Sequence, residues 1–545
     1  MKIALGQINP IIGDLEYNKN KIKEDYRKAV DDKVDIVIFP ELSLIGYPPL
    51  DLVEKKEFRQ AVSKAINELA SMSGDTALLF GAITESDDLI GTNIHNSAIL
   101  CYDHKVHFVQ EKSLIPNYDV FDEVRYFEPS KEVNVHKFKD EVLGISICED
   151  IWNDKDYWHQ RRYIHDPVED LIKKGATLLI NISASPYSYG KREDRREMLS
   201  TLVKNDGIPL AYVCCVGVQT ELVFDGASMC FNSKGELVEL GKIYEEDYLI
   251  FDTKADYDSI NKVEGSFEEE TLNGLIYGVK EYCSKLKFKK VLLGLSGGMD
   301  SAMVAYIAVK ALGKENVRVL LMPSEFSSKG SIDDSMKLIK TLGIEHNVVS
   351  IQPVFEDLNK QLKPLFDGKP FDITEENMQA RIRGMFLMSL SNKFSYLVLS
   401  TGNKSEVAVG YSTLYGDMCG GLAVIADVYK SDIFKIADFI NKEEEIIPYE
   451  IIKKAPSAEL KHNQTDQDFL PPYELLDRIL KMYLEENKEE NEITKEIGDE
   501  VLVKKVLRLV DINEFKRKQS APVLRVSAKA FGYGRRFPIV QGWRK

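Results

Sequence analysis

Short apolar runs alternate with amphipathic stretches along residues 1–250 of the chain. β-Branched and aliphatic residues dominate these runs, as they do in buried strands. The runs lie at 34–39, 77–84, 142–148, 177–183 and 210–218. Two other segments change direction at turn residues, Asp103-His104 and Ser233-Lys234-Gly235, which predicts hairpins. This mixture of hairpins and strand–helix units predicts an α/β fold built as a layered sandwich.

The alternation of apolar runs with helical sequence is more regular in the second half of the chain. Sequence with helical spacing separates four successive apolar runs, at 289–296, 316–323, 345–351 and 394–401. This order predicts a doubly wound parallel α/β sheet, whose ligand binds at the carboxyl ends of the strands. From about residue 466 the chain is highly charged with helical spacing, which predicts a helical C-terminal extension.

An acidic, weakly periodic stretch at 244–270 lies between the two patterns. Such composition is typical of a linker that closes one domain and opens the next. A length of 545 residues also accommodates more than one domain. We therefore expect two domains, at 1–258 and 259–545.

The amino-acid composition argues against several classes of partner. A net charge of -16 argues against a general nucleic-acid or membrane surface, since neutralising phosphates needs clustered Lys and Arg. The seven cysteines form no C-x-x-C pair, which favours a reducing compartment and argues against zinc. The chain starts with a strand pattern rather than a signal peptide, and no apolar run reaches the roughly 18 residues of a membrane span. We expect a soluble cytoplasmic protein.

The stretch VLLGLSGGMDS, residues 291–301, reads as a buried strand, a loop of small residues and the start of a helix. Backbone N–H groups of such a loop and the helix N-terminus bind anions, which predicts a phosphate cradle. The loop lacks the Gly-Lys-Ser/Thr ending of a P-loop. Asp300 would repel a phosphate unless a cation lay between them, so it is a candidate Mg²⁺ ligand. The alternative is an ordinary glycine-rich turn.

The segment LSGGMDS resembles the signature of the N-type ATP pyrophosphatases, which transfer AMP and hold the departing pyrophosphate. This resemblance accounts for the missing lysine and implies ATP as co-substrate with Mg²⁺ as cofactor. It also implies nucleotide contacts along the whole loop: Gly294, Leu295, Ser296, Gly297, Gly298, Met299, Asp300 and Ser301.

Three later segments, 376–392, 399–417 and 428–434, closely resemble the NAD synthetase family. Its members adenylate the carboxylate of nicotinic acid adenine dinucleotide (deamido-NAD⁺) and let ammonia displace AMP. The resemblance implies ATP contacts from Thr401 and Lys430, and it places Glu406 beside Asp300 on magnesium. The deamido-NAD⁺ contacts that it implies are Asn377, Arg381, Glu406 and Lys529.

Taken singly, these residues allow other interpretations. Arg381 and Arg383 on a helix are more often solvated or salt-bridged than bound to a ligand. The stretch STGNKSE is also consistent with a polar loop that caps a helix at Ser405.

Three polar residues of the first half follow strand patterns: Glu41, Lys112 and Cys148. A cysteine thiolate attacks an amide carbonyl, a carboxylate moves the proton, and a lysine stabilises the oxyanion and lowers the pKa of the thiol. Each residue alone has a plainer interpretation. Cys148 fits a buried core cysteine, Lys112 an exposed lysine and Glu41 a charge at the end of a strand.

Together, the segments FPELSLIGYPP, EKSLIPNYDVFDE and GISICEDIW resemble the nitrilase superfamily. Its Glu-Lys-Cys triad hydrolyses amides on a four-layer αββα fold. Glutamine is the expected amide, because the second half needs ammonia and free ammonia in neutral water is mostly protonated. Similarity to glutamine-dependent NAD synthetases implies that Tyr118, Ser185 and Lys191 bind the amino acid.

These inferences combine into an expected function. Glutamine would be hydrolysed at the first site, and its ammonia would amidate adenylated deamido-NAD⁺ at the second to form NAD⁺, with release of AMP and pyrophosphate. Similar enzymes are homo-oligomers, which implies the same for this chain. Two alternatives are another adenylating amidotransferase and a non-catalytic nucleotide sensor.

Overall fold

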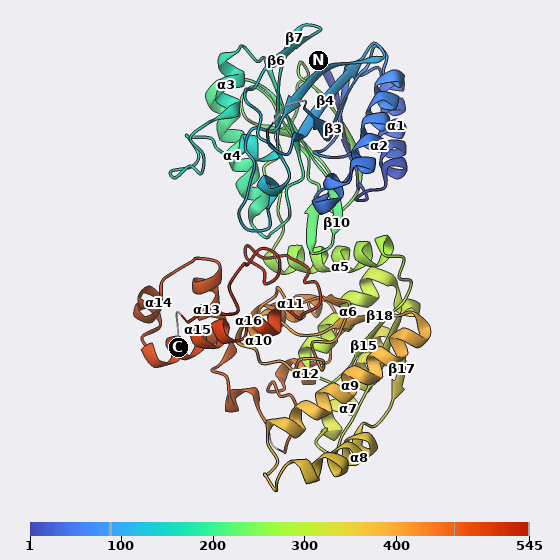
Figure 1. The fold of residues 1–545 in the computed structure, drawn as a ribbon, viewed down its shortest axis with the longest axis vertical. Helices are drawn as coiled ribbons and strands as arrows, with labels where there is room; N and C mark the ends of the chain where they lie inside the picture. The colour runs from blue at the N-terminus through green and yellow to red at the C-terminus, as the bar shows by residue number, and fades with distance from the viewer. Residues whose placement is uncertain (87–89, 463, 543–545) are drawn as a thin grey trace. The chain divides into compact units, whose positions relative to one another are not determined.

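The computed structural model describes residues 1–86, 90–462 and 464–542. The chain forms two compact units, Met1–Gly265 and Ser266–Lys545, shown in Figure 1. The domain boundary at 258/259 that we expect from the sequence stays a prediction.

The first unit contains two six-stranded sheets. One has the order β14-β1-β2-β3-β4-β5 and the other the order β13-β12-β9-β8-β7-β6. Strands of the first sheet are β1 (Lys2–Gln7), β2 (Ile36–Ile38), β3 (Ala77–Glu85), β4 (Ile94–Tyr102), β5 (Lys105–Glu111) and β14 (Asp247–Asp252). Strands of the second are β6 (Val135–Phe138), β7 (Glu141–Ile147), β8 (Leu178–Ser183), β9 (Leu210–Cys214), β12 (Met229–Phe231) and β13 (Leu237–Leu240). A separate hairpin joins β10 (Val216–Gln219) and β11 (Leu222–Asp225).

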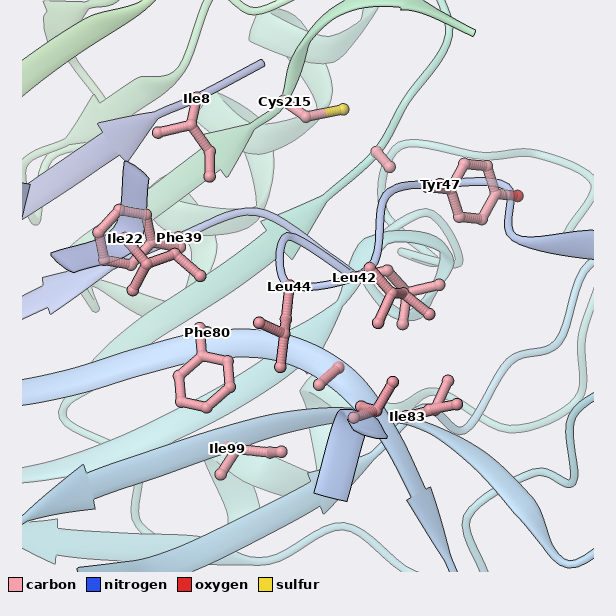
Figure 2. Close-up of a cluster of buried hydrophobic side chains, with 14 of the residues drawn as sticks. Ile8, Ile22, Phe39, Leu42, Leu44, Tyr47, Phe80, Ile83, Ile99 and Cys215 are labelled. Carbon is pink, nitrogen blue, oxygen red and sulfur yellow. The ribbon is translucent and has the colours of Figure 1, made fainter. Parts of the chain in front are cut away.

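Apolar side chains bury the two sheets against each other and against helices. Residues such as Leu5 and Ile38 of the first sheet pack with Ile145 and Ile182 of the second. The outer face of the first sheet packs on α1 (Leu15–Asp31) and α2 (Lys56–Met72), and Figure 2 shows part of this core. The outer face of the second sheet packs on α3 (Pro167–Lys173) and α4 (Lys191–Asp206). The layers are therefore αββα, and the prediction of an α/β sandwich is confirmed.

Both predicted hairpins form. β4 and β5 pair in antiparallel register around Asp103-His104, and β12 pairs with β13 around the turn at 233–235. Among the described residues of this unit, three short 3₁₀ helices lie in the loops: η1 (Leu50–Glu54), η2 (Glu123–Arg125) and η3 (Cys148–Ile151).

The second unit has a five-stranded parallel sheet in the order β17-β16-β15-β18-β19. Its strands are β15 (Val291–Gly294), β16 (Val317–Leu321), β17 (Glu345–Val348), β18 (Leu397–Ser400) and β19 (Leu422–Ala423). The chain runs outward from β15 through β16 to β17, and then returns to the other side of β15 as β18. Such a reversal opens a crevice at the carboxyl end of the central strand. The predicted doubly wound sheet is confirmed.

Helices cover the parallel sheet and extend beyond it. The long helices are α5 (Phe267–Lys285), α6 (Met299–Leu312), α7 (Lys329–Leu342), α8 (Gln352–Leu362), α9 (Ile373–Phe394) and α11 (Lys430–Ile440). Helices α8 and α9 pack on β15, β16 and β18. Shorter elements are η4 (Lys314–Asn316), η5 (Lys363–Leu365), α10 (Lys404–Val409), α12 (Tyr449–Lys453) and η6 (Asp466–Asp468).

The C-terminal extension is helical, with its own core. It contains α13 (Tyr473–Leu484), α14 (Glu490–Ile497), α15 (Glu500–Ile512) and α16 (Glu514–Arg517). Leu476, Ile479 and Val506 pack there with Val407 of α10, which joins the extension to the parallel-sheet core. Across the described ranges, no helix is both long enough and apolar enough to cross a membrane.

Candidate active sites

A buried lysine joins two elements of the first unit. Lys112 directly follows β5, and its Nζ lies 2.7 Å from Oε1 of Glu41, which follows β2. Both residues are 1% exposed. Asn96 Nδ2 also donates to Glu41 Oε1 at 2.7 Å, and the backbone N–H of Ala184 donates to Oε2 at 2.9 Å. Donors on three elements thus fix the orientation of the Glu41 carboxylate.

Lys112 contacts a second carboxylate, that of Glu123 in η2. Its Nζ lies 2.8 Å from Oε1 and 2.9 Å from Oε2 of Glu123, and Oε1 also accepts from Tyr47 Oη at 2.9 Å. Burial raises the pKa of Glu123 to about 7, aided by the charge of Glu41 and opposed by that of Lys112. Sequence reasoning did not single out Glu123, although it lies within the motif EKSLIPNYDVFDE.

Cys148 begins η3 directly after β7, and its backbone has a left-handed φ of 44°. Such a conformation is strained for a residue with a Cβ, and it is common for side chains held at functional sites. Asp150 stabilises this turn, because its carboxylate accepts from the backbone N–H groups of Ile147, Ser113 and Leu114 at 3.0, 3.0 and 2.8 Å. One buried carboxylate therefore joins the Cys148 turn to the segment that follows Lys112.

The electrostatics favour a protonated Cys148 in the free protein. Burial raises the pKa of the thiol well above its usual value, and Glu41 adds to the effect while Lys112 opposes it. The predicted lowering by lysine is therefore present but outweighed. A thiol in this state needs a base at the moment of attack, and Glu41 is the carboxylate whose charge acts on it most strongly.

Tyr118 and Ser185 lie in loops that contact this cluster, and Lys191 is the first residue of α4. Tyr118 Oη donates to Glu149, the neighbour of Cys148, at 2.8 Å. Ser185 is 2% exposed and follows the residue whose N–H binds Glu41. Lys191 Nζ donates to the carbonyl of Pro186 at 3.1 Å and lies 5.6 Å from the ring of Trp152.

A cavity of about 300 Å³ opens in the second unit. Its walls include the predicted cradle residues Gly294, Leu295, Ser296, Gly298, Met299, Asp300 and Ser301, but not Gly297. Thr401, Glu406 and Lys430 also line it. The ends of β15 and β18 thus bring the cradle and the later segments to one cavity, in the crevice that the sheet topology opens.

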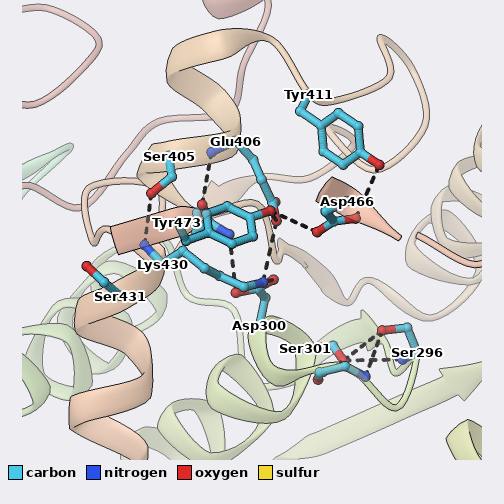
Figure 3. A network of polar contacts seen from close by, with 12 residues as sticks. Ser296, Asp300, Ser301, Ser405, Glu406, Tyr411, Lys430, Ser431, Asp466 and Tyr473 are labelled. Carbon is cyan, nitrogen blue, oxygen red and sulfur yellow. Dashed lines mark hydrogen bonds and ion pairs between the residues drawn. The ribbon is translucent and has the colours of Figure 1, made fainter. Parts of the chain in front are cut away.

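Hydroxyl groups brace the small-residue loop. Ser301 Oγ accepts from the backbone N–H of Ser296 at 3.2 Å and lies 3.1 Å from its hydroxyl (Figure 3). Gly297 has a φ of 78°, and a Cβ there would lie 2.3 Å from the carbonyl oxygen of Ser331. Only glycine fits this position, because the loop packs directly against the first turn of α7.

A second lysine bridges two carboxylates at this cavity. Lys430 Nζ bonds to Asp300 Oδ2 and lies 3.5 Å from Glu406 Oε1, as Figure 3 shows. Burial raises the pKa of Glu406 to about 8, and the charge of Asp300 adds to it. Burial lowers the pKa of Lys430, but Asp300 and Glu406 outweigh it and raise it overall. Among the described residues, no group of three or more His, Cys, Asp or Glu side chains could hold a metal ion.

The predicted deamido-NAD⁺ residues are only partly brought together. Asn377 accepts from Thr413 Oγ1, a residue of the cavity wall, at 2.7 Å. Arg381 lies in a separate groove between α8 and α9 and donates to the carbonyl of Leu414 at 3.2 Å. Lys529 Nζ donates to the carbonyl of Gly534 at 2.7 Å. Of this set, Glu406 alone is among the residues that line the main cavity.

Comparison with known proteins gives two family matches. The family described as Carbon-nitrogen hydrolase matches residues 2–260, and the family described as NAD synthase matches residues 271–520. A glutamine-dependent NAD(+) synthetase from Synechocystis sp. is 42% identical over 99% of both chains. The one from Thermotoga maritima is also 42% identical, over 100% of this chain and 99% of its own. This chain belongs to the glutamine-dependent NAD(+) synthetase family.

Comparison with a solved structure agrees with membership of this family. The glutamine-dependent NAD⁺ synthetase of Acinetobacter baumannii, in complex with adenosine diphosphate, is 38% identical with a TM-score of 0.78. The similarity covers 99% of each chain. The family's fold is therefore present over the full length of this chain.

Further residues of the second cavity escaped sequence reasoning. Asp466 accepts from Tyr473 Oη at 2.8 Å and from Tyr411 Oη at 3.2 Å, close to Glu406 (Figure 3). Lys454 and Glu459 also line the cavity. In the described part of the chain none of these residues directly follows a strand, so the pattern that revealed the cradle gave no signal for them.

Gly81 of β3 supports the position of Glu41. A Cβ at Gly81 would lie 2.2 Å from the backbone nitrogen of Leu42 and 2.7 Å from the carbonyl carbon of Glu41. Gly81→Ala should therefore move the Glu41 loop, with a loss of about 1–3 kcal/mol in the free energy of unfolding. A shift near 1 Å lowers catalytic efficiency about 100-fold. Glutamate release measures that efficiency for glutamine.

Gly74→Ala is the matched control, because the nearest atom to its Cβ is Tyr26 Oη at 4.0 Å. It should keep wild-type glutamine hydrolysis. Wild-type kcat/KM for glutamine in a folded Gly81→Ala protein would show that the contact does not position Glu41.

Proposed function

We propose that this chain makes NAD⁺ from deamido-NAD⁺, ATP and glutamine. Membership of the glutamine-dependent NAD(+) synthetase family supports this function. The observation that carries it is the pairing of two sites on one chain. A buried Glu41–Lys112 pair with Cys148 lies in the first unit, and the loop at 294–301 lines a cavity in the second.

At the first site, the Cys148 sulfur attacks the side-chain amide carbon of glutamine. Glu41 accepts the thiol proton as the S–C bond forms, and Lys112 donates a hydrogen bond to the oxyanion. The C–N bond then breaks, and Glu41 returns the proton to the departing ammonia. Water then attacks the thioester carbon while Glu41 takes a proton from it. The C–S bond breaks, Glu41 returns the proton to the Cys148 sulfur, and glutamate is released.

We assign Tyr118, Ser185 and Lys191 to binding of glutamine. Tyr118 and Glu149 form a hydrogen-bonded pair beside Cys148, where an ammonium group of the substrate would find a carboxylate. Lys191 carries a positive charge at the start of α4, suited to the α-carboxylate. Ser185 lies in the loop that also binds Glu41.

At the second site, the carboxylate of deamido-NAD⁺ attacks the α-phosphorus of ATP, and the bond to pyrophosphate breaks. The 294–301 loop and the N-terminus of α6 hold the leaving pyrophosphate through N–H and hydroxyl groups. Ammonia then attacks the acyl adenylate, which releases AMP and forms the amide of NAD⁺. Thr401 and Lys430 are assigned to ATP, and Asn377, Arg381, Glu406 and Lys529 to deamido-NAD⁺.

Asp300 and Glu406 fit a Mg²⁺ ion. They offer two carboxylates, the hard donors that this ion prefers, on one cavity wall. When bound, Mg²⁺ neutralises phosphate charge. Lys430 holds both carboxylates in the free protein, so the same ammonium group is free to contact a phosphate once a cation pairs with them. A cytoplasmic location and a homo-oligomeric assembly stay predictions from the sequence.

The adenylation step determines which products form. Transfer of AMP requires that each NAD⁺ formed is matched by one AMP and one pyrophosphate, and that Mg²⁺ is essential. Anion-exchange chromatography of a reaction with labelled ATP measures both. ADP and orthophosphate as the primary products would contradict adenylation.

The variant Cys148→Ala should separate the activities of the two sites. The variant lacks the nucleophile, so glutamine-driven NAD⁺ formation should fall by at least about 10³-fold. High concentrations of ammonium salt should still support near-normal NAD⁺ formation, because the second site is intact. Unchanged use of glutamine would exclude Cys148 as the nucleophile, and loss of both activities in a folded variant would show that the sites are inseparable.

Asp300→Asn is the reciprocal variant, which changes the second site and leaves the first intact. Loss of one of the two carboxylates proposed to hold Mg²⁺ should lower NAD⁺ formation by about 10²-fold or more with either nitrogen donor. Glutamate release, measured with the synthetase substrates present and absent, should persist. Near-normal synthesis from ammonia would show that the metal assignment is wrong.

A further inference from the structure

The first turn of α7 forms part of the nucleotide cavity. Ser327, Ser331 and Ile332 line the cavity together with the small-residue loop. The packing of Gly297 against Ser331 places this turn directly beside the proposed pyrophosphate cradle. No acidic residue lies in the first turn of α7, although its N-terminus carries positive partial charge.

A carboxylate from a distant segment binds this turn. Glu459 Oε1 accepts from the hydroxyls of Ser328 and Ser331 at 2.9 and 2.7 Å, and Oε2 accepts from the N–H of Ser328 at 3.2 Å. Lys454 Nζ donates to the same Oε1 at 2.7 Å and also bonds to Ser331 Oγ. Glu459 thus accepts hydroxyl, backbone and ammonium donors, a set that also suits a phosphate oxygen.

The surrounding charges favour an anion at this place. Lys454 and Arg383 both line the cavity, and Glu459 is the carboxylate that interacts with each of them. Arg383 donates through Nε to the carbonyl of Met322 at 3.1 Å. Burial lowers its pKa to about 10, and Glu459 opposes that effect. A buried guanidinium on the cavity wall is a second feature that suits a phosphate-bearing ligand.

The backbone at Glu459 is strained. Its φ is 48°, in the left-handed region that residues with a Cβ avoid. The carboxylate contacts hold this conformation, so their release would relax the segment. The side chain keeps 19% of its surface exposed, which leaves it open to displacement from the cavity side.

We propose that Glu459 is an internal anion that occupies part of the nucleotide cavity in the free protein and is displaced by the phosphate groups of ATP. The inference rests on the proposed use of ATP by this cavity. Lys454 and the α7 N-terminus are neutralised by Glu459 until ATP supplies stronger negative charge. Glu459 therefore lowers the affinity for ATP and keeps Lys454 paired while the cavity is empty.

Equilibrium binding of ATP to the full chain tests this proposal. Glu459→Gln keeps the shape of the side chain and removes its charge, so ATP should bind roughly tenfold more tightly. The affinity of the same variant for inorganic pyrophosphate should rise by a similar factor. Glu459→Gly also removes the backbone strain and should likewise bind ATP more tightly. Isothermal titration calorimetry measures each dissociation constant, and circular dichroism checks folding.

Asp333→Asn is the matched control, because it removes one negative charge from an exposed position of the same helix. It should leave ATP affinity unchanged. Lys454→Gln should weaken ATP binding more in the Glu459→Gln background than in the wild type, since the lysine is then unpaired.

Equal or weaker ATP binding by both Glu459 variants would overturn the proposal and make Glu459 a brace for Lys454. An equal rise in ATP affinity in Asp333→Asn would also overturn the proposal, because the change in net charge alone would explain the tighter binding. Wild-type protein that binds no ATP would instead refute the proposed function, and the inference with it.

Discussion

A buried lysine held between two carboxylates organises each of the two sites. Lys112 joins Glu41 to Glu123 in the first unit, and Lys430 joins Asp300 to Glu406 in the second. Removing such charges from water is costly unless each finds partners, so these contacts fix the side chains closely. One ammonium for two carboxylates leaves each cluster with excess negative charge. Burial is the main cause of the raised pKa values of Glu123 and Glu406, about 7 and about 8, and the neighbouring carboxylate adds to it in each cluster.

The two clusters use this excess differently. In the first site the carboxylate beside Cys148 can take a proton from a thiol whose own pKa is raised by burial. Acid–base chemistry there needs no external cation. In the second site, Asp300 and Glu406 are the carboxylates that we propose for a metal ion, which would leave Lys430 to contact a phosphate. Glu459 and Lys454 repeat the theme on another wall of the same cavity, with a carboxylate that neutralises a cation.

Sheet topology explains why each cluster forms where it does. Glu41, Lys112 and Cys148 come after β2, β5 and β7, strands of two sheets that pack face to face. The 294–301 loop follows β15, the strand from which the chain runs out in both directions. Apolar burial sets the sheets, and polar side chains gather at their ends because backbone pairing stops there.

The sequence by itself determined both fold classes and the chemically distinctive residues. Short apolar runs and helical spacing predict strands and helices from local hydrophobicity, and the motifs around Cys148 and Asp300 stand directly beside such strands. Only the tertiary structure decided which partners these residues meet. Glu123, Asn96 and Glu459 lie 11, 55 and 131 positions from the residues that they bind, and no local pattern encodes such contacts. The net direction of the Cys148 pKa also depended on burial, which the packed sheets create and the sequence spacing does not express.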